Sequence, residues 1–429
     1  MQTLLVASRK GLFVVRGQGA QWAIASHHFA GDPVTQVMVD PRNGHWYAAL
    51  RMGHFGVKLR KSTNEGANWV EVTAPAFPPK PADGPLAADN TPWNVEMIWS
   101  LTAGSVDQPG TLWAGCMPAG LFKSDDSGLG WALNRPLWED PRRLGWFGGG
   151  NDFPGMHSVL VDPRNAQHIT VAISCGGVWQ TLDGGQSWAL TADGMTADYL
   201  PADSAQDPNT QDPHRMVQCA AEPDVLWVQH HCGLYRSTNG GQHWAGIAAP
   251  APSGFGFAVA CDPADPQRAW FVPAVSDTHR YAVNGKMVVN RTDDGGATFK
   301  TFSQGLPQAH AYHLVYGTAW SWHRTAPRWP CRPPQGACGS AQMRVSSGTA
   351  SHVTCRRWRR WGGSWLERFT TAALRLLAGV RWRAGPSALV GAAVRAGPRC
   401  FANAFAGLTP HRVYSRFALS IFQHSPAGG

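Results

Sequence analysis

Residues 181–188 read Thr-Leu-Asp-Gly-Gly-Gln-Ser-Trp, and this pattern of a hydroxyl residue, Asp or Asn, Gly and an aromatic ring occurs five times in the chain. The other copies lie at 62–69, 124–131, 237–244 and 292–299, and successive aromatic positions are 62, 57, 56 and 55 residues apart. A unit of this length cannot bury its own hydrophobic face. The repeat therefore predicts a stacked or radial array of similar units.

Each copy of the motif predicts a turn between two strands. A short apolar run precedes the turn, as in Gly177-Val178-Trp179. The Asp or Asn side chain accepts hydrogen bonds from backbone N–H groups ahead of it, and Gly supplies the positive φ of a tight hairpin. We therefore expect a structural, not a catalytic, role for Asn64, Asp126, Asp183, Asn239 and Asp294.

The motif resembles the Asp-box, or BNR repeat, of sialidase-like β-propellers, sortilin-type receptors and related assembly factors. The resemblance covers residues 1–316. It implies an all-β fold in which four-stranded blades surround a central channel.

Strand patterns within this region predict seven intended blades. The first blade starts one strand late, at residues 3–29, and its inner strand would come from the C-terminal end of the propeller. The expected inner strands of the other blades are Thr35–Asp40, Val95–Leu101, His157–Asp162, His214–Cys219, Phe255–Asp262 and His310–Tyr316. The last blade lacks its own turn motif and closing strand, so we expect it to be lost or scrambled.

Residues 317–429 differ sharply in composition from the body. Of the 37 basic and 28 acidic residues, 16 Arg and only Glu367 lie in this tail, so its net charge is +15 and that of the body is −6. The gene can also be read in the frame that starts each codon one base earlier. With permitted codon choices, that frame encodes Ser-Ala-Asp-Ala-Gly-Glu-Leu-Trp, a complete turn motif that ends near the position of Gly348. We therefore interpret 317–429 as an out-of-frame tail with disordered or irregular structure, and 1–316 as the propeller domain. The alternative is a genuine basic C-terminal domain.

Charge and hydropathy exclude several function classes. A mildly acidic body argues against nucleic-acid binding, and no apolar stretch reaches the length of a membrane span. The N-terminus lacks a basic region and a long apolar core, so we expect no signal peptide. The five body cysteines show no metal-ligand spacing, which favours reduced thiols in the cytoplasm. The sequence assigns no oligomeric state.

Topology predicts a ligand site on the face opposite the turn motifs. In a four-stranded meander, the loop that enters the inner strand and the loop between strands two and three share this face. Long insertions at 74–94, 136–155 and 192–213 decorate it, with Trp93, Trp146, Phe147 and Tyr199 available for stacking. The expected ligand-binding residues are His54, His157, His214, Arg215, His231, His310 and Tyr312.

Three functions fit this polar set. The first, which we rank highest, is binding of a glycan or another small molecule. The sialidase resemblance adds the option of glycan cleavage, for which Glu96 and Asp277 are the best catalytic carboxylates and Asp152, Asp203 and Asp212 are substitutes. The arginine triad, Tyr/Glu pair and N-terminal signature of sialidases are not found. Alternatively, His157, His214 and His310 bind a divalent metal for hydrolase or lyase chemistry, although the sequence requires no cofactor. The third alternative is a non-catalytic module that binds a peptide or protein.

Overall fold

Six antiparallel sheets make up the computed structural model, which describes residues 2–18, 21–312 and 314–317. The first sheet has three strands: β1 (Gln2–Ser8), β2 (Gly11–Gln18) and β3 (Gln21–His28). The second and third contain β4 (Val34–Val39), β5 (Trp46–Arg51), β6 (Val57–Ser62), β7 (Val70–Val72), β8 (Met97–Ala103), β9 (Leu112–Met117), β10 (Leu121–Ser124) and β11 (Ala132–Leu133).

The other three sheets repeat the four-stranded pattern. They contain β12 (Met156–Val161), β13 (Ile169–Ile173), β14 (Gly177–Thr181), β15 (Ala189–Leu190), β16 (Pro213–Gln218), β17 (Leu226–His230), β18 (Gly233–Ser237), β19 (Ala245–Ile247), β20 (Gly256–Asp262), β21 (Asp265–Pro273), β22 (Val289–Thr292) and β23 (Lys300–Phe302). Every neighbouring pair within a sheet follows the chain order, so each sheet is a simple meander.

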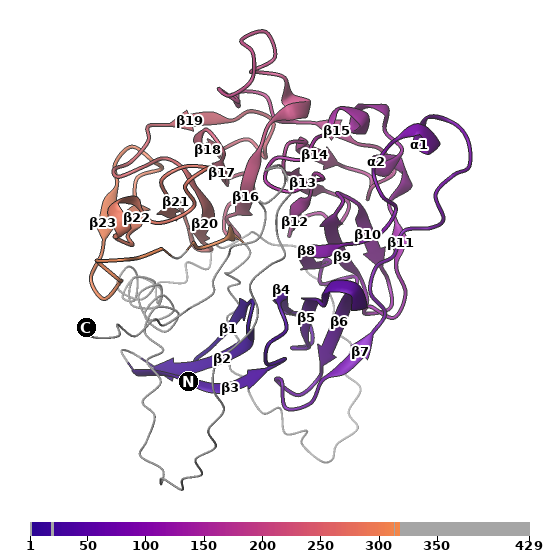
Figure 1. Ribbon diagram of the computed structural model, residues 1–429, viewed down its shortest axis with the longest axis horizontal. Helices are drawn as coiled ribbons and strands as arrows, with labels where there is room; N and C mark the ends of the chain where they lie inside the picture. Colours follow the sequence, from indigo (N-terminus) through magenta and orange to yellow (C-terminus); the bar gives the residue numbers. More distant parts are fainter. Residues whose placement is uncertain (1, 19–20, 313, 318–429) are drawn as a thin grey trace, which may run out of the picture.

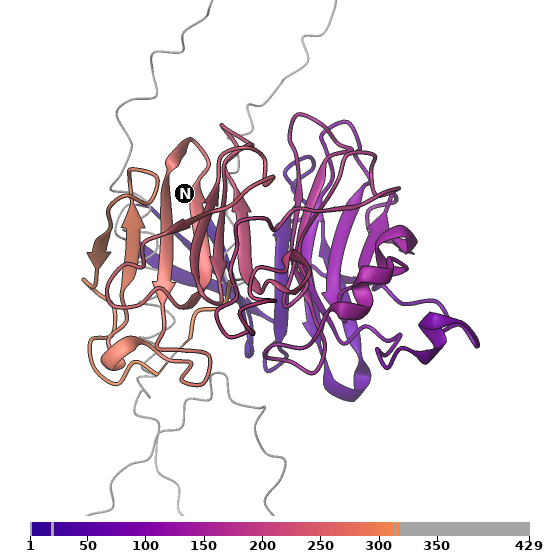
Figure 2. The same cartoon turned by 90° about the horizontal axis from the view of Figure 1, so that it is seen from above.

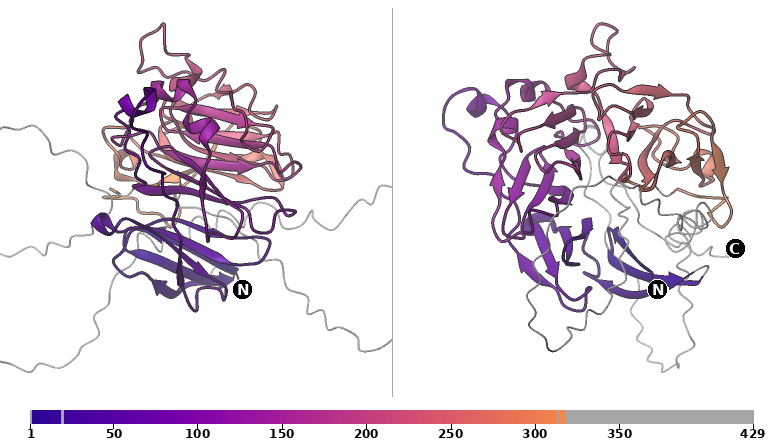
Figure 3. Two further views of the ribbon diagram at one scale, coloured as in Figure 1. Left: turned by 90° about the vertical axis from the view of Figure 1, so that its right-hand side faces the viewer. Right: turned by 180° about the vertical axis from the view of Figure 1, so that it is seen from behind.

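The sheets are arranged radially, which makes the fold a β-propeller. The strands β1, β4, β8, β12, β16 and β20 lie nearest the centre, and the last strand of each sheet lies at the rim (Figure 1). A quarter turn shows that the strands run between the two faces of the ring (Figure 2). The view from behind shows the same order of sheets around the centre (Figure 3).

Apolar side chains from consecutive sheets form the core between blades. Trp113 of the third sheet packs in one cluster with Val171 and Trp179 of the fourth, and Met216 of the fifth packs in another with Val178 of the fourth. Strands buried on both faces read as continuous apolar runs, as β13 does. This packing between units is what the repeat period requires.

Side chains of the inner strands also join neighbouring blades through hydrogen bonds. Thr35 Oγ1 donates to the carbonyl of Ile98 at 2.8 Å, and Thr102 Oγ1 donates to the carbonyl of Val159 at 2.8 Å. The inner strands of the second, third and fourth sheets are thus fixed to one another at the channel.

The turn motif at 181–188 is held by its own polar side chains. Thr181 Oγ1 accepts from the backbone N–H of Gly185 at 2.8 Å and donates to Asp183 Oδ1 at 2.6 Å. Asp183 Oδ1 also accepts from the N–H groups of Gln186 and Ser187, both at 2.9 Å. In the other four copies, the hydroxyl oxygen likewise accepts a hydrogen bond from the backbone N–H of the motif's glycine. These hydroxyl residues are Ser62, Ser124, Ser237 and Thr292.

The turn motifs share one face of the ring with the loops that follow the inner strands. The N–H of Gly184 donates to the carbonyl of Gln167 at 3.0 Å, and Gly240 bonds Asp224 at 2.9 Å. Equivalent bonds join Ser127 to Gly110 and Gly295 to Gln267. We call this side the motif face and the opposite side the motif-free face, where the loops between second and third strands lie.

Short helical segments lie mainly in the insertions. They are η1 (Gly53–Phe55), α1 (Pro85–Ala88), α2 (Arg135–Trp138), η2 (Pro141–Gly145), η3 (Pro208–Thr210) and η4 (Val283–Gly285). Each of the two α-helices has four residues, so within the described ranges no helix reaches the length needed to cross a bilayer.

The structure confirms the all-β propeller and differs from the prediction at its C-terminal end. The inner strands β4, β8, β12, β16 and β20 begin and end within two residues of the expected bounds. The strand expected at His310–Tyr316 was wrong: Ala311 and Val315 instead pack as irregular chain against the sixth sheet. The described residues form six blades where seven were expected. The rest of the seventh blade and the tail, beyond Gly317, lie outside them.

Candidate functional site

Two imidazoles and a carboxylate converge on the motif-free face where the fourth and fifth sheets meet. They belong to Asp212, His214 and His231, which we call the Asp212 cluster. One potential ligand atom from each side chain lies within 4.8 Å of the others. Asp212 and His214 are buried to more than nine-tenths of their side chains, and His231 is about one-fifth exposed. Carboxylate oxygen and neutral imidazole nitrogen are both common metal ligands.

The register of β16 on β17 places these three residues together. Pro213 pairs with His230, so Asp212 just before β16 lies beside His231 just after β17. The N–H of His231 donates to the carbonyl of Asp212 at 2.9 Å. The register shifts between Pro213 and Arg215, and such a bulge re-aims the side chain of the extra residue, His214.

The two oxygens of Asp212 have different partners. Oδ1 accepts from Ser174 Oγ at 3.0 Å and from the N–H of Cys175 at 3.2 Å, both in the β13–β14 loop of the neighbouring sheet. Oδ2 lies 3.5 Å from His214 Nε2 and 3.2 Å from His231 Nδ1. Burial alone would raise the pKa of this carboxyl, but hydrogen bonds with His214 and His231 and the charge of His214 hold it well below its usual range.

His214 presents an acceptor nitrogen to Asp212. Its Nδ1 lies 2.7 Å from the carbonyl oxygen of Gly256, which can only accept, so Nδ1 carries the proton. In the neutral ring Nε2 is then a lone-pair acceptor that faces another acceptor, Asp212 Oδ2. A cation between these atoms, either a metal ion or a proton on the imidazole, satisfies both. A hydrogen bond from the far ring nitrogen to a carbonyl is the usual support of a metal-binding histidine.

Aromatic rings enclose the cluster. The ring of Phe257 stacks on His214 with centroids 4.4 Å apart, and Phe255 meets both imidazoles edge to face at 5.6 Å. Tyr199, from the insertion at 192–213, contacts His231 at 4.8 Å. Burial and the nearby groups of Cys175 and Asp212 raise the pKa of the Tyr199 phenol. Burial and the Asp212 charge likewise raise the pKa of the Cys175 thiol, so both groups are neutral near pH 7.

His230 supports the cluster from behind. It is fully buried, and its two ring nitrogens lie 3.0 Å from the backbone nitrogens of Asp212 and Cys232. Burial lowers its pKa to about 3, so the ring is uncharged at neutral pH. A neutral imidazole accepts at one ring nitrogen only, so His230 accepts a hydrogen bond from one of these two backbone N–H groups and packs against the other.

His157 and Arg215 lie at the same junction but inside the protein. His157 is buried, its Nδ1 lies 2.8 Å from Ser158 Oγ, and burial followed by the Arg215 charge lowers its pKa to about 3. Arg215 Nη1 donates to the carbonyl of His157 at 2.7 Å and so joins β12 to β16. Burial lowers the pKa of this guanidinium to about 10.

The structure does not gather the other expected site residues around this cluster. His54 lies on η1 against Phe55, and Glu96 pairs with Arg51 at 3.3 Å, both at the second and third sheets. Asp277 accepts from the N–H of Thr278 in the β21–β22 loop of the sixth sheet. His310 and Tyr312 are exposed and contact each other near η4, with ring centroids 6.3 Å apart.

The sequence pattern that marks this site is the pairing of Asp212-Pro213-His214 with His230-His231. These stretches begin one strand and end the next, and the register brings them together. Sequence reasoning named both imidazoles but gave Asp212 only a substitute role. The predicted metal ligands were His157, His214 and His310, each in a different blade, because the sequence had no means of predicting the bulge at His214.

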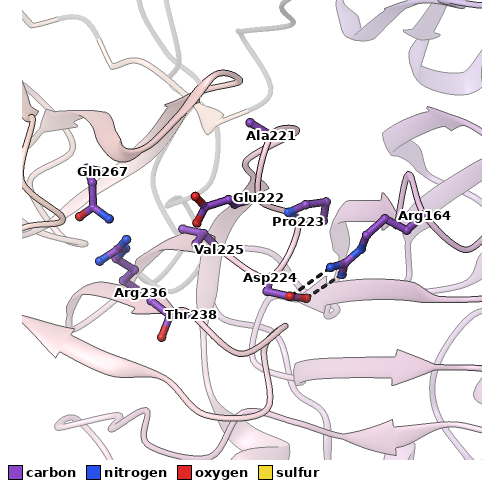
Figure 4. A pocket seen from close by; sticks show the side chains of 9 residues that line it. All are labelled: Arg164, Ala221, Glu222, Pro223, Asp224, Val225, Arg236, Thr238 and Gln267. Carbon is purple, nitrogen blue, oxygen red and sulfur yellow. Dashed lines mark hydrogen bonds and ion pairs between the residues drawn. The ribbon is translucent and has the colours of Figure 1, made fainter. Parts of the chain in front are cut away.

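A cavity of about 470 Å³ lies on the motif face (Figure 4). It is lined by residues of the fifth sheet and its neighbours, among them Arg164, Glu222, Asp224, Arg236 and Gln267. Arg164 pairs with Asp224 through contacts of 2.6 and 3.0 Å, and also with Asp162. Asp224 and Asp162 already neutralise Arg164, and among the described residues three potential metal ligands converge at the Asp212 cluster and not in this cavity.

Comparisons with known proteins give structural likeness only. No family model matches the chain, and no curated protein matches it. An ancestral GH74 enzyme shares 19% identity over 72% of this chain and 33% of its own, with a TM-score of 0.46. The GH74 enzyme of Niastella koreensis shares 17% sequence identity. The match covers 70% of this chain and 43% of the enzyme, with a TM-score of 0.46. YCF48 from Cyanidioschyzon merolae shares 14% sequence identity. The match covers 73% of this chain and 86% of YCF48, with a TM-score of 0.45. The chain thus spans less than half of either GH74 enzyme.

Proposed function

We propose that the chain binds a divalent transition metal ion at the Asp212 cluster and, on that ion, a small polar molecule at the motif-free face. The observation that supports this most strongly is the convergence of His214 Nε2 and His231 Nδ1 on one oxygen of Asp212. Ligands about 2.0–2.1 Å from a tetrahedral ion lie roughly 3.3 Å apart. The separations of 3.5 and 3.2 Å between Asp212 Oδ2 and the two nitrogens are close to that spacing, and all three atoms lie within 4.8 Å of one another.

The donor set indicates which ions fit. Two imidazoles and one carboxylate suit Zn²⁺, Fe²⁺ or Mn²⁺, and a site with three protein ligands leaves positions for water or a ligand. A metal held in this way polarises a bound carbonyl or lowers the pKa of bound water, which is the basis of hydrolase or lyase chemistry. Tyr199 and Phe255 beside the imidazoles would pack against the apolar part of the ligand.

Glycan binding or cleavage is the alternative that the turn-motif resemblance implies, and it would rely on Glu96 and Asp277. Glycosidase carboxylates face each other across roughly 5–9.5 Å. Glu96 already pairs with Arg51 and belongs to the third sheet, whereas Asp277 belongs to the sixth. We therefore rank glycan cleavage below the metal site. A non-catalytic role in binding a peptide or protein is the other alternative.

Metal analysis of the purified chain tests the proposal. After incubation with Zn²⁺ and removal of free ion, mass spectrometry should find about one ion per chain. His214→Ala and His231→Ala should each lose it. His243→Ala is the matched control, because His243 forms an exposed pair with Asp193 at 2.7 Å and lies outside the cluster. A zinc-free wild type, or equal zinc in all four proteins, would overturn the proposal.

A further inference from the structure

An exposed arginine stands beside the Asp212 cluster without an acidic partner among the described residues. Arg280, in the β21–β22 loop, is exposed, and its Nε donates to the carbonyl of Asp277 at 2.7 Å. Its guanidinium carbon lies 5.6 Å from the centre of the Phe257 ring, the same ring that stacks on His214. Among the described residues no carboxylate lies within ion-pair distance of Arg280. Its two terminal nitrogens therefore remain available to an anion.

The insertion loop at 147–152 brings this guanidinium close to the cluster. A Cβ on Gly149 would lie 2.7 Å from Cys175 Sγ and 3.4 Å from Asp212 Oδ2. A Cβ on Gly150 would lie 2.7 Å from Arg280 Nη2. Consecutive Cα atoms are about 3.8 Å apart. Neighbouring residues of one loop thus pack beside the carboxylate of the cluster and against the guanidinium, and the absence of side chains at both positions permits this close approach.

We infer that the ligand of this site is a small dicarboxylate, with one end on the metal and the other on Arg280. This inference rests on the proposed metal site. A planar guanidinium binds a carboxylate through two parallel hydrogen bonds, which a lysine ammonium cannot reproduce. Phe257 contacts both His214 and Arg280, so the metal site and the guanidinium share one aromatic neighbour.

Malate and lactate test the inference because they share the 2-hydroxy acid that chelates a metal, and only malate has a distal carboxylate. In calorimetric titrations of the zinc-loaded chain, malate should bind at least about ten-fold more tightly than lactate. That ratio is the gain in affinity expected from one charge-assisted hydrogen bond. Arg280→Gln should reduce malate affinity to that of lactate and leave lactate affinity unchanged. Arg280→Lys should recover part of the difference.

Controls separate this inference from the metal site itself. Arg135→Gln removes another exposed arginine, paired with Glu139 at 2.8 Å, and should bind malate as the wild type does. Zinc content is measured before and after each titration, so that loss of the ion to malate is detected. Equal affinities for malate and lactate with zinc retained would overturn the dicarboxylate inference alone. Absence of zinc from the wild type would overturn the proposed function and this inference together.

Discussion

Pro213 lies directly opposite His230 in the antiparallel pair of β16 and β17, and this one pairing determines the candidate site. It sets Asp212 beside His231, and the bulge that follows turns His214 towards the same oxygen. The loop between β13 and β14 then fixes the other oxygen through Ser174 and Cys175. Two sheets of the propeller thus contribute to one polar cluster, which the rigid inner strands hold in place.

His230→Ala should weaken both the fold and the metal site. The substitution removes a fully buried ring whose nitrogens lie 3.0 Å from the backbone of Asp212 and Cys232. We expect the free energy of unfolding to fall by about 2–3 kcal/mol and zinc affinity to fall with it. Urea denaturation and zinc titration measure the two effects. Unchanged values for both would show that His230 does not support the cluster.

Glycine substitutions should separate backbone strain from steric clash in the turn motif. Gly185 has a φ of +94°, and a Cβ there would lie within van der Waals radii of Asn134 Nδ2, whereas Gly31 has a φ of +91° and open space around it. Gly31→Ala should lower the free energy of unfolding by about 1–2 kcal/mol through strain alone. Gly185→Ala should lower it by at least about 1 kcal/mol more. Equal losses in denaturation experiments would contradict the packing of this turn against Asn134.

Stability should fall steeply below pH 6 because of two buried histidines. Burial lowers the pKa of His157 and of His230 to about 3, from an unfolded value near 6.5. Above pH 6.5 both histidines are neutral in the folded chain and in the unfolded chain. Between pH 6 and pH 4 the unfolded chain takes up a proton at each site that the folded chain does not, so stability is lost as the pH falls.

The contribution of one histidine can be isolated with His157→Gln. Each group contributes up to about 1.4 kcal/mol per pH unit within that window. The free energy of unfolding, measured between pH 6 and pH 4, should therefore change less steeply in the variant by about that amount. The same slope in both proteins would mean that His157 is protonated in the folded chain.

The repeated motif predicted most of the fold because the hydrogen bonds that close each turn lie within the motif itself. The hydroxyl residue, the Asp or Asn and the Gly of each copy close a turn on their own, as Thr181, Asp183 and Gly185 do. Once the turns were located, the strands between them followed. The strand expected at 310–316 was wrong for a non-local reason: an inner strand needs a second strand beside it, and the described residues after 303 provide none.

The candidate site was predicted only in part. His214 and His231 were expected on the motif-free face because topology alone assigns strand entrances and second loops to it. The radial arrangement of the blades suggested that each blade contributes one histidine to a metal site. The structure instead turns His157 inwards against Ser158 and places His310 near η4. The role of Asp212 depends on strand register and on a bulge, which arise from pairing between strands and leave no sign in either strand alone.

The most direct test of the metal site is a crystal structure of the zinc-loaded chain with data collected at the zinc absorption edge. We predict one anomalous peak about 2.0–2.2 Å from His214 Nε2, His231 Nδ1 and Asp212 Oδ2. The His214 ring should keep its hydrogen bond from Nδ1 to Gly256. An anomalous map without a peak at these three atoms, or with the zinc bound elsewhere, would contradict the account.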